Sequence, residues 1–367
     1  MKQWIRLGFI ARGWLAPAHI RPGAMMAAVV VLAAFVASCL AAGPAQAGPV
    51  AQISPAGQQT EDDPLFAKVY AHVNTAGGKV PVFRTPEDAI SNASPVRELN
   101  GYEWVTVLNT VEIEGVRVSQ INAEEWIVAD KLTFTRPSRF QGRFFDETPD
   151  RPFAWVLSEF QPTLQPDGAA NTAAPVYRRY DVVQIYEKAV VGATIWYRIG
   201  EQQWTRQQRL GIVTPRQAPP QITNTRERLH GKWIFVNIYE QTLAAYEGER
   251  LVFASLASSG LPKWETIKGV FQIQYKNRLQ PMYNGAGDPS LGEYYLEEVP
   301  FNMFFSGDYA LHGAYWHDGF GYKKSRGCVN LSVRDARWLF DWSDPKVSQW
   351  GYAQAGKSNP GTWVWVW

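Results

Sequence analysis

Apolar and polar residues alternate in short runs along most of the chain, and glycine, proline or asparagine separates one run from the next. The runs are rich in valine, isoleucine, threonine and aromatic residues, which favour extended backbone. They predict strands at residues 80–83, 104–108, 126–128, 180–186, 196–200, 233–238, 242–246, 251–256 and 362–367. The pattern therefore predicts a mainly β protein.

One segment has the character of a short helix instead. Residues 335–342 (DARWLFDW) form a compact run of helix-compatible residues, and Ser332 just before them is a favourable N-cap. Gly248 lies between two predicted strands and predicts the turn of a hairpin.

Composition divides the rest of the chain into a tether, two β modules, a linker and a last domain. Residues 48–64 have no apolar rhythm and are interpreted as a flexible tether. Residues 216–224 lie in a stretch rich in proline and glutamine and are interpreted as a linker. We expect β modules at 65–149 and 152–215, and an independently folding domain at 225–367.

The two predicted modules share a loose strand plan, in which Gln202-Gln203-Trp204 echoes Glu124-Glu125-Trp126. This rhythm resembles the SH3-like modules of bacterial wall enzymes. The alternative, a single irregular β domain with no binding role, stays open.

The N-terminus has the pattern of an export signal. A basic segment precedes the apolar run 24–37, and a small-residue cleavage site at 45–47 follows. Cleavage predicts a secreted protein whose leader is 1–47. Two alternatives stay open, namely lipidation of Cys39, which makes it the mature N-terminus, and retention of the run as a membrane anchor.

Removal of the leader changes the charge of the protein. Residues 1–47 hold four basic and no acidic side chains, so 32 basic and 34 acidic residues remain from the totals of 36 and 34. The mature chain is then slightly acidic, which argues against a nucleic-acid partner. Any contact with a membrane is expected only through the leader or a lipid anchor.

Cysteine usage is the most informative count. The chain has two cysteines, Cys39 and Cys328, and the first belongs to the leader or carries lipid. Cys328 is therefore an unpaired thiol in an oxidising compartment, which is unusual for an exported protein. It is either an inert buried residue or a functional nucleophile.

A possible general base precedes this thiol. His312 lies sixteen residues before Cys328, and histidine is the usual base for a cysteine nucleophile. The predicted helix follows Cys328, so its dipole is expected to favour the thiolate. Gly327 allows a tight turn whose N–H groups can face a substrate carbonyl, as an oxyanion hole requires.

These residues belong to a longer motif. His312-Gly313, followed by Ser325-Arg326-Gly327-Cys328-Val329-Asn330, resembles the signature of the YkuD-type L,D-transpeptidase catalytic domain. The resemblance covers about residues 230–367 and includes Ser258-Ser259-Gly260 and the segment 266–271. It implies a β-sandwich domain with the cysteine in a cleft and one short helix after it.

The resemblance also implies a reaction and a set of roles. Cys328 is expected to attack the amide between the third and fourth residues of a peptidoglycan stem tetrapeptide, and an acceptor amine then makes a 3-3 cross-link. His312 is the implied base, oriented by the carbonyl near Gly313, while Ser325 and Gly327 shape the oxyanion region. The expected substrate-binding residues are Arg326, Asn330, Trp316 and Tyr295. Carbapenem β-lactams are expected inhibitors, and no cofactor or metal is expected.

One position departs from the common motif, because Arg326 replaces a second histidine. Arginine stays charged and cannot act as a base, so His312 is expected to do this alone. His317 lacks the partners of a zinc site and is expected to line the cleft or be exposed. Trp316 and Tyr295 are also compatible with packing and with a solvated loop, respectively.

Two other functions stay open. Water can resolve the same acyl-enzyme, which would make the protein an L,D-carboxypeptidase. The chain can also be a wall-binding protein without activity, although the complete motif argues against this.

Overall fold

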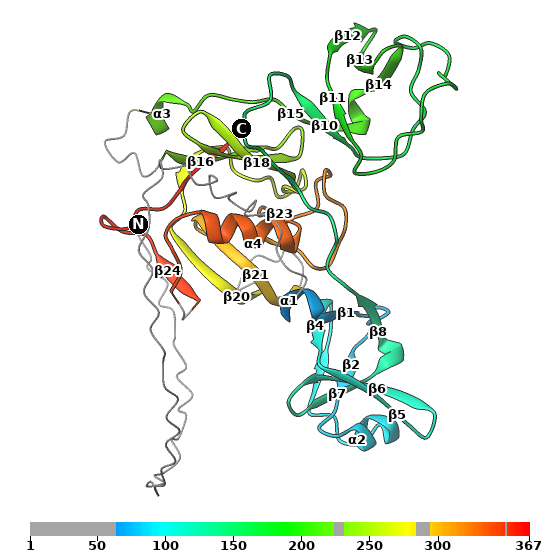
Figure 1. Cartoon of the computed structure of the whole chain (residues 1–367). Coiled ribbons are helices and arrows are strands. Elements are labelled where there is room, and N and C mark those ends of the chain that lie inside the picture. Colours follow the sequence, from blue (N-terminus) through cyan, green and yellow to red (C-terminus); the bar gives the residue numbers. More distant parts are fainter. Residues whose placement is uncertain (1–63, 224–230, 284–293, 349–350) are drawn as a thin grey trace, which may run out of the picture. The chain divides into compact units, whose positions relative to one another are not determined.

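The computed structural model describes residues 64–223, 231–283, 294–348 and 351–367 (Figure 1). The chain divides into two compact units, residues 1–52 and 53–367, and every described residue belongs to the second. The predicted leader 1–47, Cys39 and nearly all of the tether 48–64 lie outside the described residues. Among the described residues, no helix is long and apolar enough to span a membrane.

The prediction of a mainly β protein is confirmed. In the C-terminal part, a six-stranded sheet has the order β19-β25-β16-β17-β18-β9. The C-terminal strand β25 lies beside β16 in parallel, and all other pairs in this sheet are antiparallel. The strands are β9 (Arg143–Phe144), β16 (Lys232–Asn237), β17 (Thr242–Glu247), β18 (Arg250–Leu256), β19 (Gly269–Gln272) and β25 (Trp363–Val366).

A second, eight-stranded sheet branches at its longest strand, β21 (Tyr294–Ser306). The end of β21 pairs with β22, its beginning pairs in parallel with β4 of the first module, and β20 lies along it. The other strands of the C-terminal part of this sheet are β20 (Tyr275–Tyr283), β22 (Tyr309–Gly313), β23 (Val329–Leu331) and β24 (Tyr352–Gln354).

The two sheets enclose the largest apolar core. Strands of the six-stranded sheet contribute Ile234, Leu243 and Phe253, and the facing strands contribute Phe301 and Leu311 among others. These side chains are almost completely removed from water, so their burial is the main source of stability for the sandwich.

The predicted short helix is confirmed as α4 (Val333–Trp342), directly after β23. The Ser332 hydroxyl caps its start by accepting the Asp335 N–H at 3.1 Å. At the other end, the buried amino group of Lys276 donates to the carbonyls of Phe340 and Ser343, and burial lowers its pKa to about 7. These hydrogen bonds occupy carbonyls near the helix end that lack helical partners.

The first module consists of α1, α2, a short 3-10 turn and eight strands. Strands β4, β1 and β8 continue the eight-stranded sheet, while β5-β6-β7 and β2-β3 form separate small sheets. The elements are α1 (Pro64–Ala67), β1 (Val69–Val73), β2 (Val80–Val82), α2 (Pro86–Ser91), β3 (Arg97–Leu99), β4 (Tyr102–Val107), β5 (Asn109–Ile113), β6 (Val116–Asn122), β7 (Glu125–Val128), η1 (Ala129–Lys131) and β8 (Leu132–Thr135).

The second module consists of two three-stranded sheets, β11-β10-β15 and β12-β13-β14. Its elements are β10 (Phe153–Val156), β11 (Val182–Gln184), β12 (Glu187–Val191), β13 (Thr194–Gly200), β14 (Gln203–Arg206), η2 (Gln207–Arg209) and β15 (Leu210–Val213), and α3 (Pro220–Thr223) follows. The SH3-like character of both modules stays a prediction.

Packing crosses the predicted domain boundaries. Strand β9 comes from the end of the predicted first module and pairs with β18 of the sandwich. Trp155 of the second module packs in one apolar cluster with Trp233 and Tyr246 of the six-stranded sheet. The sandwich therefore shares core residues with both modules.

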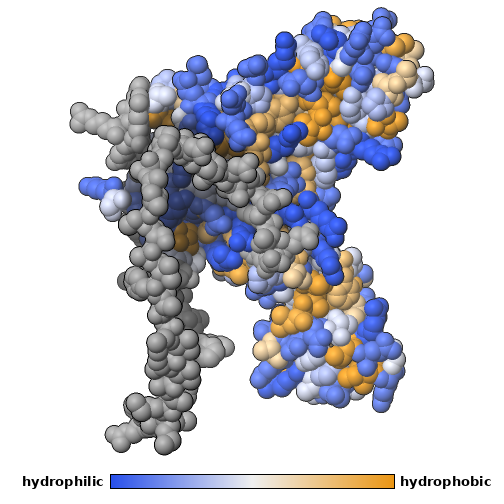
Figure 2. Space-filling view, in the orientation of Figure 1, coloured by the Kyte–Doolittle hydropathy of each residue, from blue (hydrophilic) through white to orange (hydrophobic). Residues whose placement is uncertain are grey.

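On the face of the molecule seen in Figure 2, hydrophilic and hydrophobic residues are intermixed.

Candidate active site

Strand pairing brings the motif residues together. Strands β22 and β23 are parallel neighbours, and in their register His312 lies opposite Asn330. Cys328 comes just before β23, so it reaches the same end of the sheet as His312. The long loop 314–328 between the strands makes this parallel pairing possible.

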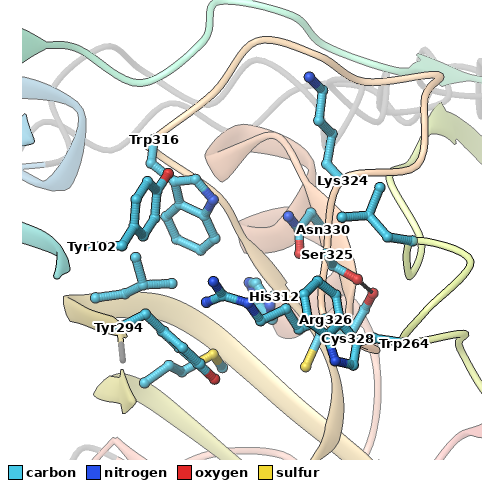
Figure 3. A pocket seen from close by; sticks show the side chains of 13 residues that line it. Tyr102, Trp264, Tyr294, His312, Trp316, Lys324, Ser325, Arg326, Cys328 and Asn330 are labelled. Atoms are coloured by element: carbon cyan, nitrogen blue, oxygen red, sulfur yellow. Dashed lines mark hydrogen bonds between the residues drawn. The ribbon is translucent and has the colours of Figure 1, made fainter. Parts of the chain in front are cut away.

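An open pocket of about 210 Å³ lies at this place (Figure 3). Its wall combines the candidate nucleophile and base with aromatic, apolar and cationic side chains. The lining residues are Tyr102, Leu261, Trp264, Met282, Tyr294, Leu296, His312, Trp316, Lys324, Ser325, Arg326, Cys328 and Asn330. The predicted pair thus shares one cavity, to which β4 of the first module contributes Tyr102.

His312 is buried and held in one tautomer. Its Nδ1 lies 3.2 Å from the carbonyl oxygen of Gly313, which can only accept, so Nδ1 carries the proton. The unprotonated Nε2 is then the basic atom. Desolvation lowers the pKa of His312 to about 4, although the Gly313 carbonyl opposes this shift. The ring is therefore neutral at pH 7 and able to accept a proton.

The Cys328 side chain is partly exposed at the pocket, and its thiol donates to the Asp308 carbonyl at 3.4 Å. Burial raises the pKa of this thiol to about 11, and the nearby Asp308 carboxylate adds to the effect, while the Ala310 N–H opposes it. The resting sulfur is protonated, so the thiolate that the helix is expected to favour is not the resting form. Strand β23 separates Cys328 from α4, and the dipole of a helix acts mainly near its end.

The turn before Cys328 is braced from two sides. The Ser325 hydroxyl donates to the Cys328 carbonyl and accepts the Gly327 N–H at 3.1 Å. The Thr266 hydroxyl donates to the Gly327 carbonyl at 2.7 Å. Gly327 has φ +126°, and a Cβ there would lie 2.9 Å from the Tyr309 ring. Glycine is thus required by both conformation and space.

Arg326 supplies positive charge to the pocket. Its guanidinium carbon lies 4.4 Å from the ring centre of Tyr294 and 5.4 Å from that of Trp264. Such stacking holds the planar guanidinium and leaves its N–H groups available for an anion. In Figure 3 the Lys324 side chain points away from the centre of the pocket, so Arg326 is the cation nearer to it.

His317 does not line the pocket. Its Nδ1 accepts the Gly319 N–H at 3.1 Å, and its Nε2 lies 2.9 Å from the amide nitrogen of Asn330. Asn330 is 2% exposed and does line the pocket. His317 is therefore linked to the site through Asn330. Among the described residues, no three His, Cys, Asp or Glu side chains are placed to hold a metal ion.

The structure brings most predicted site residues together and leaves some outside the lining. Trp316 lines the pocket, and its ring centre lies 5.7 Å from that of His312. Gly313 and Gly327 act through their backbones. Tyr295 lies outside the lining, because alternation along β21 turns Tyr294 toward the pocket instead. The lining residues missed by sequence reasoning are Tyr102, Leu261, Trp264, Met282, Tyr294, Leu296 and Lys324.

The signals for these missed residues differ. Tyr294 is adjacent to Tyr295, and only the register of β21 selects between them. Tyr102 enters the pocket through the β4–β21 pairing, which joins segments almost two hundred residues apart and has no local sequence signal. The assembled site holds a protonated thiol, a neutral imidazole and a cation, which suits nucleophilic acyl transfer to a charged substrate.

Comparison with known proteins finds a family that the C-terminal part of the chain resembles. The family model of the L,D-transpeptidase catalytic domain (YkuD) matches residues 231–366. A putative L,D-transpeptidase of Bacillus subtilis, YciB, is 25% identical over 124 residues, which cover 30% of this chain and 59% of the relative. The chain thus spans less than two thirds of the length of that curated relative. The predicted resemblance of the C-terminal domain is confirmed.

Solved structures of L,D-transpeptidases share low sequence identity with this chain. An Enterococcus faecium L,D-transpeptidase mutant is 19% identical with a TM-score of 0.30, covering 37% of this chain and 50% of that one. An L,D-transpeptidase from Mycobacterium tuberculosis is 18% identical with a TM-score of 0.29, and the match covers 52% of this chain and 73% of that one. The family assignment rests on the sequence match and not on these likenesses.

Proposed function

Because residues 231–366 match the family model of the L,D-transpeptidase catalytic domain, we propose that the chain is an L,D-transpeptidase that acts on peptidoglycan stem peptides outside the cytoplasmic membrane. One observation carries the proposal. Cys328 and His312 line the same pocket inside the matched domain, with the chemistry that a cysteine acyltransferase needs.

The acylation step begins from the neutral pair. Nε2 of His312 takes the thiol proton as the Cys328 sulfur attacks the carbonyl carbon between the third and fourth stem residues. The backbone N–H of Cys328 stabilises the developing oxyanion, and the braced turn at Ser325 and Gly327 holds that N–H in place. The intermediate then collapses, His312 returns the proton to the departing amine, and a thioester on Cys328 remains.

The second step transfers the acyl group. An amine from a neighbouring stem attacks the thioester and loses a proton to His312, and Cys328 leaves as a thiol after taking that proton back. The products are a cross-linked peptide and the free enzyme. A cation at Arg326 suits the carboxylates of such peptides, and the Trp316 and Tyr294 rings form an apolar wall for the stem.

Products distinguish this function from its alternatives. The protein is incubated with purified disaccharide-tetrapeptide and the products are analysed by mass spectrometry. A cross-linked dimer supports the transpeptidase. A tripeptide without dimer means that water resolves the acyl-enzyme, as in an L,D-carboxypeptidase. An unchanged tetrapeptide contradicts both enzymes and leaves a wall-binding protein. Cys328→Ala is the control, because it lacks the nucleophile.

Inhibition by β-lactams follows from the same chemistry. A thiol activated for attack on a stem amide can open the strained ring of a carbapenem. One L,D-transpeptidase, LdtMt1, has been solved in complex with imipenem, and another structure is the Ldtfm-avibactam carbamoyl enzyme. For this chain, intact-mass analysis should find one carbapenem adduct, which Cys328→Ala abolishes.

Export is part of the proposal. It is supported by the leader 1–47, in which a basic segment precedes an apolar run. The exported protein is then either free, lipidated at Cys39 or anchored in the membrane by the apolar run. Labelling of cells with a lipid precursor distinguishes modification of Cys39 from simple cleavage. A cytosolic protein with an intact leader would contradict export.

A further inference from the structure

The hydrogen bonds of His317 permit only one placement of its proton. The Gly319 N–H points at Nδ1 from 3.1 Å, so Nδ1 is an acceptor and carries no proton. Burial, together with the nearby Lys324 charge, lowers the pKa of His317 to about 4, so the ring is neutral at pH 7. A neutral imidazole has one N–H. That N–H is therefore on Nε2, the atom that faces Asn330.

A donor at Nε2 determines the orientation of the Asn330 carboxamide. Nε2 lies 2.9 Å from the amide nitrogen, which is also a donor, while the buried Oδ1 has no hydrogen-bond partner among the described residues. A half-turn about the Cβ–Cγ bond exchanges the two amide atoms with almost no change of shape. Oδ1 then accepts from Nε2–H, so the contact between two donors is removed, and the NH₂ group takes the buried position without a protein partner that Oδ1 held.

Both partners are held firmly. The backbone N–H and carbonyl of Asn330 bond to Ser258, each at 2.9 Å. The loop that carries His317 is held at the Asp318 carbonyl by Arg179 at 2.9 Å and by the Tyr180 hydroxyl at 2.8 Å. Because neither residue can shift easily, the single hydrogen bond between them controls which way the carboxamide points.

We propose that His317 is a positioning residue, which holds the Asn330 carboxamide by its oxygen so that the NH₂ group faces the pocket and donates to a carbonyl oxygen of the bound peptide. The orientation follows from the hydrogen bonds alone, while the role of the NH₂ group rests on the proposed function. Asn330 lines the pocket with His312 and Cys328. A buried NH₂ without a protein partner gains its hydrogen bond only when a peptide carbonyl arrives.

The proton placement is measured without any substrate. Long-range ¹H–¹⁵N correlation spectra of the full chain with labelled histidine report the tautomer of each ring, and His317→Gln assigns the signal. At pH 7 the His317 ring should be neutral with its proton on Nε2. A proton on Nδ1, or an imidazolium at pH 7, overturns the proposal whatever the enzyme does.

Matched substitutions test the consequence for Cys328. The amide of glutamine can replace the Nε2 donor, whereas that of asparagine replaces only the Nδ1 acceptor. We therefore expect His317→Gln to keep most of the rate of acylation by a carbapenem or a tetrapeptide. His317→Asn should lose about tenfold or more, as for the loss of one hydrogen bond in the transition state. Asn330→Asp, which can accept but not donate, should lose at least as much.

The outcomes separate this inference from the proposed function. All three variants are first checked for wild-type cooperative unfolding. If the wild-type protein is not acylated at Cys328, the proposed function fails, and the tautomer spectra still decide the placement of the proton. If the wild-type protein is acylated and folded His317→Asn reacts equally fast, the positioning role is overturned.

Discussion

His312 and Asn330 lie opposite each other in the parallel pairing of β22 with β23. Residues in register on neighbouring strands face the same side of a sheet, so this pairing places the base next to the end of the motif that carries Cys328. His312 and Cys328 are sixteen residues apart along the chain, and this pairing brings them to the same pocket.

The first prediction concerns the different roles of His312, as the proton acceptor, and Arg326, as a substrate-binding cation. His312→Ala removes the proton acceptor and should slow acylation of Cys328 by roughly 10²–10⁴-fold. Arg326→Ala should mainly raise KM for peptides that carry carboxylates, because the guanidinium binds without moving a proton. Stopped-flow acylation and steady-state kinetics measure the two effects. A nearly active His312→Ala variant would mean that another group is the base.

The second prediction concerns pH. Since the pKa of His312 is about 4 and that of Cys328 about 11, the resting pair stays neutral from about pH 5 to pH 10. The rate of acylation should therefore be nearly constant between pH 5.5 and 9.5, a window chosen inside these limits. Alkylation by iodoacetamide needs the thiolate and should rise throughout that window. Alkylation that reaches a plateau below about pH 8 would show that the resting residue is a thiolate.

The third prediction concerns the pocket wall supplied by the first module. Tyr102 is 38% exposed and lines the pocket, although it belongs to β4. Tyr102→Ala should raise KM for the stem peptide several-fold and leave kcat almost unchanged, because the ring does not touch the reacting atoms. Tyr186→Ala is the matched control, since Tyr186 is an exposed tyrosine outside the pocket lining. Equal kinetics of the two variants would remove Tyr102 from the substrate site.

The fourth prediction concerns independent folding of residues 225–367. In the structure, Tyr70 of the first module stacks on Tyr315 with ring centres 3.7 Å apart, and Trp155 of the second module packs in the cluster of Trp233. Removal of both modules exposes these apolar faces to water. Residues 225–367 alone should therefore unfold more than about 10 °C below residues 64–367. Equal melting temperatures would support the independent domain that sequence composition predicts.

The fifth prediction concerns Asp335 and stability. Its buried carboxylate accepts the Gly142 N–H and the Ser255 hydroxyl, yet burial raises its pKa from 3.8 to about 6. The folded state thus binds this proton more tightly than the unfolded state. Its contribution is full below about pH 3.8 and is lost as the pH rises through 6, by on the order of 3 kcal/mol.

Comparison of the wild-type protein with Asp335→Asn isolates this contribution, because His312 and His317 have the opposite pH dependence and are present in both. Urea unfolding between pH 4 and pH 7 should show that the wild-type protein loses stability relative to the variant as the pH rises. A difference that does not change with pH would contradict the raised pKa.

The sequence by itself determined the local features of this protein. The alternation of side chains predicts the strands β16, β17 and β18, and Ser332 predicts the start of α4. The pair of His312 and Cys328 is recognisable because its motif is contiguous and its residue types are chemically demanding. These features depend on neighbours in the chain, which the sequence contains directly.

Only the tertiary structure decided the features that depend on distant contacts. The pairing of β4 with β21 selects Tyr294 rather than Tyr295 for the pocket and adds Tyr102 to it. Burial by the surrounding strands, and not the nearby helix, sets the direction of the Cys328 pKa. The link from His317 to Asn330 likewise arises from a loop that folds back on the sheet. Desolvation and strand register both depend on contacts between residues far apart in the chain, so no local sequence pattern predicts them.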